Sequence, residues 1–110
     1  MKKLIQTLLV ISLMAATAAV ADVKKGQKFY LKSFKSKFGM NGAKFASLHT
    51  MDEWSELFED EGEGFIEKYS EEFPRATKVL NSKKMQKKMT HLRDFVIEYA
   101  NDSGNVPSCG

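Results

Sequence analysis

Two short segments of this chain pair a histidine with a methionine at the same spacing. His49 stands two residues before Met51, and Met89 stands two residues before His91. Imidazole and thioether groups are suitable ligands for Cu(I), and they are also the axial ligands of cytochrome c haem iron. The four side chains therefore indicate a copper site, unless the methionines fill gaps in the core and the histidines lie exposed near helix starts.

Cys109 is the only cysteine of the chain, so no intramolecular disulfide can form. An unpaired cysteine in an exported protein suggests an intermolecular disulfide or a free thiol. Its sulfur, or that of Met40, could also complete the copper site. The alternative for Cys109 is incidental exposure.

Charged residues gather in two separate runs. Lysines occupy positions 83, 84, 87 and 88, and acidic residues dominate positions 59–63. Such an asymmetry can steer a charged partner, although a solvated helix face is the simpler interpretation. No nucleophile stands at a recognisable spacing from a base, so we do not expect an enzyme.

The first 21 residues have the form of a secretory signal peptide. Lys2 and Lys3 precede an apolar stretch, and residues 19–21 have the A-x-A form that a signal peptidase cuts. The strongly apolar part is shorter than the roughly 20 residues of a membrane-spanning helix. We therefore expect cleavage after Ala21, a periplasmic location and no stable membrane insertion afterwards.

Cleavage after Ala21 would leave 89 of the 110 residues, enough for one small domain. We expect this domain to cover residues 22–104 and a flexible tail to cover 105–110. Without Lys2 and Lys3 the 17 basic residues become 15, against 14 acidic ones. This balance argues against a nucleic-acid partner.

The apolar residues recur at helical spacing, and no segment alternates as a half-buried strand does, so the sequence predicts an all-α fold. Thr50 and Glu53 form a capping box, which marks a helix start. The expected helices cover residues 22–37, 50–58, 65–73, 76–80 and 90–100. Residues 40–49 and the acidic residues 59–64 are expected to form loops.

Residues 32–39 resemble a c-type haem attachment site that has lost its ligands. Such a site needs the pattern C-x-x-C-H. Phe34 and Lys37 stand at the thiol positions, Phe38 stands at the histidine position, and Gly39 follows.

With this segment, the first and last predicted helices resemble those of the class I c-type cytochrome domain. The resemblance implies a small orthogonal helical domain in which the N- and C-terminal helices cross. Gly26 and Tyr30 would then face Phe95 and Tyr99. The resemblance also implies that Met89 would be the axial methionine ligand if haem were held without covalent attachment.

Eight phenylalanines in so short a chain suit an interior packed without a cofactor. The leading hypothesis is therefore an exported, non-catalytic binding or accessory protein of the cell envelope, with a respiratory redox system as one setting. It would have a periplasmic protein partner and no covalent cofactor. The alternatives are an electron carrier with non-covalent haem and a periplasmic Cu(I)-binding protein.

Overall fold

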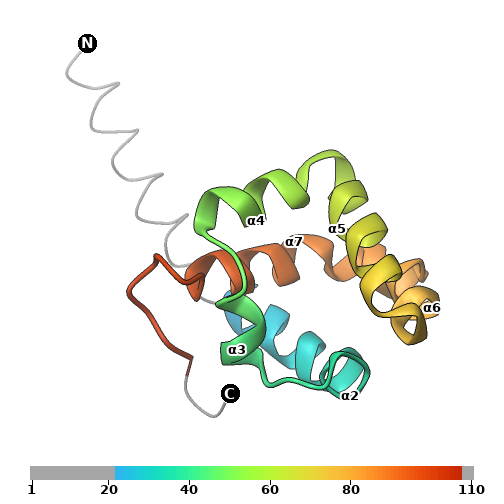
Figure 1. Ribbon diagram of the computed structural model, residues 1–110, viewed down its shortest axis with the longest axis horizontal. Coiled ribbons are helices and arrows are strands. Elements are labelled where there is room, and N and C mark those ends of the chain that lie inside the picture. The colour runs from blue at the N-terminus through green and yellow to red at the C-terminus, as the bar shows by residue number, and fades with distance from the viewer. Residues whose placement is uncertain (1–21, 108–110) are drawn as a thin grey trace, which may run out of the picture.

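A computed structural model describes residues 22–107 of the chain. These residues contain helices and connections but no strand, which confirms the all-α prediction for this part (Figure 1). The predicted signal peptide and Cys109 lie outside the described residues. The helices are residues 22–33 (here the first helix), α2 (Lys35–Phe38), α3 (Gly42–Ala46), α4 (Met51–Leu57), α5 (Glu59–Glu72), the 3-10 helix η1 (Pro74–Ala76), α6 (Thr77–Leu80) and α7 (Lys83–Glu98).

The first helix and α2 together cover the helix predicted at residues 22–37. They are separated by a turn at Phe34, whose backbone leaves the helical region at φ −121° and ψ −26°. The Phe34 N–H still donates to the Tyr30 carbonyl, and the Phe38 N–H donates to the Phe34 carbonyl. Gly39 then ends α2 in the left-handed conformation, with φ 72°, which glycine adopts without steric cost.

The loop predicted at residues 40–49 is wrong in part, because α3 occupies its centre. The Asn41 side chain caps this helix by accepting a hydrogen bond from the Lys44 N–H. Phe45 and Ala46 are fully buried, so packing stabilises a helix too short to form alone.

The capping box that was predicted at the start of α4 is confirmed. The Thr50 hydroxyl accepts from the Glu53 N–H, and the Glu53 carboxylate accepts from the Thr50 N–H. Trp54 follows on the buried face, where its indole N–H donates to the Ala46 carbonyl. This bond connects α4 to α3.

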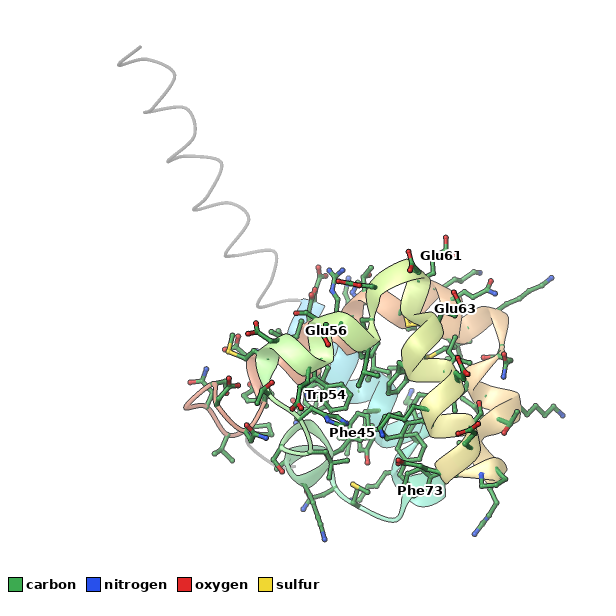
Figure 2. The ribbon with its side chains drawn as sticks, turned by 45° about the horizontal axis from the view of Figure 1, so that its top comes forward. Phe45, Trp54, Glu56, Glu61, Glu63 and Phe73 are labelled. Carbon is green, nitrogen blue, oxygen red and sulfur yellow. The ribbon has the colours of Figure 1, made fainter. Side chains whose placement is uncertain are left out.

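Residues 59–64, here called the acidic turn, reverse the chain between α4 and the rest of α5. Asp60, Glu61 and Gly62 are all left-handed, with φ of 52°, 59° and 76°. The loop expected at residues 59–64 is thus correct only for residues 60–62, because Glu63 and Gly64 already belong to the helical part of α5. Figure 2 shows Glu61 and Glu63 on the outer side of the turn. Gly62 packs on the side chain of Met89, which anchors the turn against α7.

The last helix begins at Lys83 and not near Thr90 as predicted. The Ser82 hydroxyl accepts from the Met85 N–H and provides the N-cap. Lysine is a good helix former, and Met85 and Met89 continue the buried stripe of this helix toward its N-terminus. The basic segment is therefore the first half of α7.

Helix α7 runs through the middle of the fold, between α4 and the first helix (Figure 1). Gly26 of the first helix lies against the α7 backbone at His91. No polar or charged residue among positions 22–107 is classed as buried. The buried interior is mostly aromatic, and the rings that we call the aromatic core are Phe29, Tyr30, Phe34, Phe38, Phe45, Trp54, Phe58, Phe65, Tyr69 and Phe95.

Within residues 22–107, no helix combines the length and the apolar character needed to cross a membrane.

Candidate functional site

The segment that resembles a haem attachment site belongs to the aromatic core. Phe34 and Phe38 are buried and stack on each other, with ring centroids 5.0 Å apart. Lys37 is only partly covered. The two phenylalanine rings therefore lie inside the fold.

Phe38 has aromatic neighbours from α3 and from the C-terminal part of α5. Its ring centroid lies 4.7 Å from that of Phe73, 5.4 Å from Phe45 and 5.5 Å from Tyr69. Figure 2 shows Phe45 beside Trp54 in the interior and Phe73 near the end of α5. The space around the Phe38 ring is therefore filled by aromatic side chains. A phenylalanine side chain has no atom that could serve as a metal ligand.

Two tyrosines place hydroxyl groups within the core. The Tyr30 hydroxyl donates to the Met40 carbonyl over 2.7 Å, and burial raises the pKa of Tyr30 above its usual value. Burial raises the pKa of Tyr69 in the same way. Both phenols therefore stay protonated at neutral pH and act as hydrogen-bonding groups.

His49 packs against the edge of the aromatic core. Its Nε2 atom lies 3.0 Å from the Tyr69 hydroxyl, and its ring meets Trp54 edge to face at 4.6 Å. Its Nδ1 atom lies 3.9 Å from the Glu53 carboxylate. The histidine thus bridges a buried phenol and an exposed acid.

Burial lowers the pKa of His49 from its ordinary value of 6.5. Glu53 and Glu72 oppose this shift, whereas Lys68 adds to it. The unfolded chain therefore binds this proton more tightly, and the free energy of unfolding should fall as the pH drops from about 6.5 through the folded pKa. Above that window His49 should contribute no pH dependence.

His49→Gln should remove this part of the pH dependence, because an amide does not titrate. The measurement is urea unfolding of both proteins between about pH 7 and pH 5. The wild type should lose more stability on acidification than the variant. Equal losses of stability in the two proteins would show that protonation of His49 does not destabilise the folded state.

The four proposed copper ligands have different neighbours. His91 faces the first helix, with Nδ1 3.4 Å from the Asp22 carboxylate, whereas His49 contacts Trp54 and Tyr69. Met51 is exposed and Met89 is buried against Gly62. No three or more His, Cys, Asp or Glu residues in the described part are grouped so that they could hold a metal ion.

A basic hollow lies between the first helix and α7. Its volume is about 280 Å³, and Phe29 contributes to its lining. The remaining lining residues are five lysines, here called the lysine face: Lys25, Lys28, Lys32, Lys84 and Lys88. Only the two lysines from α7 belong to the lysine run at positions 83–88. The other three have the spacing i, i+3 and i+7, which places them on one side of the first helix.

No protein-family model, curated protein or solved structure matches this chain.

Neither the lysine face nor the acidic turn is neutralised by ion pairs within residues 22–107. No carboxylate of residues 22–107 forms an ion pair with the lysine face. The acidic turn likewise contains no ion-paired residue in that part of the chain. The charges of both surfaces are thus free to meet another molecule.

Proposed function

We propose that this protein is an exported, non-catalytic binding protein of the cell envelope, with a cytochrome-c-like frame and no cofactor. One observation carries the proposal: Phe34 and Phe38, which stand at a thiol position and at the histidine position of the haem-site pattern, are buried against each other and against further rings. Aromatic side chains then supply the apolar volume that haem supplies in a cytochrome of this size. Export rests on the signal peptide predicted at residues 1–21.

Contacts between the first helix and α7 support the cytochrome-like part of the proposal. A Cβ atom on Gly26 would overlap the His91 carbonyl oxygen and lie 2.8 Å from the Phe95 Cβ. The Tyr30 and Phe95 ring centroids are 6.2 Å apart, and those of Phe95 and Tyr99 are 5.6 Å apart. Close approach at a glycine, flanked by aromatic rings, is what crossed terminal helices of this kind require.

Thermal unfolding with added ligands tests the proposal against its two alternatives. A ligand that binds the folded state at about 100 times its Kd stabilises it by about 2.7 kcal/mol, which raises the melting temperature measurably. We expect neither hemin nor Cu(I) to raise it, because the aromatic core is filled and the His/Met pairs have separate neighbours.

Two variants identify the cause of any stabilisation that does occur. A rise with hemin that Met89→Ala abolishes would replace the proposal with a non-covalent haem carrier. A rise with Cu(I) that His49→Ala/His91→Ala abolishes would replace it with a copper-binding protein.

A further inference from the structure

We infer that the lysine face is a docking site for an acidic, extended segment of a partner protein. The inference rests on the proposed binding function and names the chemistry of the partner. Its five lysines come from two helices that are far apart in the sequence, and they surround one hollow. The fold therefore brings lysines from two distant segments of the chain to one hollow.

The lysine face is unfavourable for the isolated protein. The first turn of α7 contains no acidic residue, and Lys83 and Lys84 begin the helix. The N-terminus of a helix carries partial positive charge, so lysines there are repelled, whereas a bound anion is attracted. Neighbouring lysines without a paired carboxylate add further repulsion. An acidic partner would relieve both effects.

The shape of the hollow favours a linear partner. Lys25, Lys28 and Lys32 form a row along the first helix, and Lys84 and Lys88 form a row along α7. Residues four apart on a helix are separated by about 6 Å along its axis, and alternate side chains of an extended peptide are separated by about 6.6 Å. Alternate acidic side chains of an extended segment could therefore meet Lys28 and Lys32 of one row, or Lys84 and Lys88 of the other.

The same surface is less suited to a membrane. The exposed large apolar residues of the described part are Leu48, Met51 and Val106, and none of them lines the hollow. An amphipathic surface that enters the headgroup region needs such residues beside its lysines. The lysines also lie around a hollow and do not form a flat face.

The probe is a fluorescein-labelled peptide of alternating glutamate and serine, titrated with the protein purified after export. The triple variant Lys28→Gln/Lys32→Gln/Lys88→Gln should weaken peptide binding about tenfold or more, since each substitution removes an attractive charge. Lys37→Gln/Lys44→Gln/Lys78→Gln removes the same net charge outside the hollow and should change the affinity by less than about twofold. Circular dichroism checks that both variants are folded.

Three results would overturn the inference. The two triple variants could weaken binding equally, which would indicate attraction to net charge alone. Vesicles of phosphatidylglycerol could bind through the same lysines while the peptide does not, which would indicate a membrane surface. Sedimentation could show self-association that Glu61→Gln/Glu63→Gln abolishes, which would make the acidic turn of a second copy the occupant. None of these outcomes depends on whether haem binds, so failure here is distinct from failure of the proposed cofactor-free state.

Discussion

Replacing Phe38 with alanine should lower the free energy of unfolding by about 3–5 kcal/mol. The side chain is buried and has ring neighbours in the first helix, the turn at Phe34, α3 and α5, so its removal leaves a cavity that several elements line. A domain of the 89 residues expected after cleavage has a total stability of about 4–13 kcal/mol. The variant should therefore be partly unfolded at physiological temperature or close to it. Urea unfolding followed by circular dichroism measures the loss.

Two control substitutions show how much of the stability loss in Phe38→Ala comes from the buried ring. Phe38→Leu keeps most of the apolar volume and should cost about half as much or less. Leu48→Ala removes an exposed apolar side chain and should change stability by less than about 0.5 kcal/mol. If Phe38→Ala costs no more than Leu48→Ala, the aromatic core does not stabilise the fold in the way we propose.

Gly26→Ala should destabilise the protein by about 3 kcal/mol, because the added methyl group would overlap the His91 carbonyl oxygen. The obstacle is α7 backbone and cannot rotate away as a side chain could, so the two helices must move apart. This loss outweighs the gain of about 1 kcal/mol that alanine offers over glycine within a helix. We expect the melting temperature to fall by on the order of 15 °C.

Gly64→Ala is the matched control, since this glycine is also helical. A Cβ atom there would meet only ordinary contacts, the nearest being the Leu57 carbonyl oxygen at 3.4 Å. The substitution should be neutral or stabilising by up to about 1 kcal/mol. Equal effects at both glycines would mean that the first helix and α7 do not depend on close approach at Gly26.

Local sequence signals predicted much of the fold. The capping box at Thr50 marks a helix start through its own side chain and backbone, and the structure has this boundary. The start of α7 was predicted too late because four of its first six residues are lysines, so that little apolar periodicity marks this part of the helix. The first half of α7 is stabilised by the burial of Met85 and Met89 against other elements. This burial is a property of the assembled fold.

The surface was harder to predict than the interior. The burial of Phe34 and Phe38 agrees with their aromatic character. The lysine face was missed because Lys28 and Lys88 are far apart in the sequence and meet only when the first helix packs on α7. For the same reason, the equal spacing of the two His/Met pairs did not reveal that His49 and His91 have different neighbours.

An absorption spectrum of the protein, produced with the signal peptide predicted at residues 1–21 and purified from the periplasm of a host that makes c-type cytochromes, tests the central claim most directly. If aromatic rings fill the space that haem would occupy, the spectrum should show tyrosine and tryptophan absorbance and no Soret band. A Soret band corresponding to nearly one haem per chain would contradict this account of the interior.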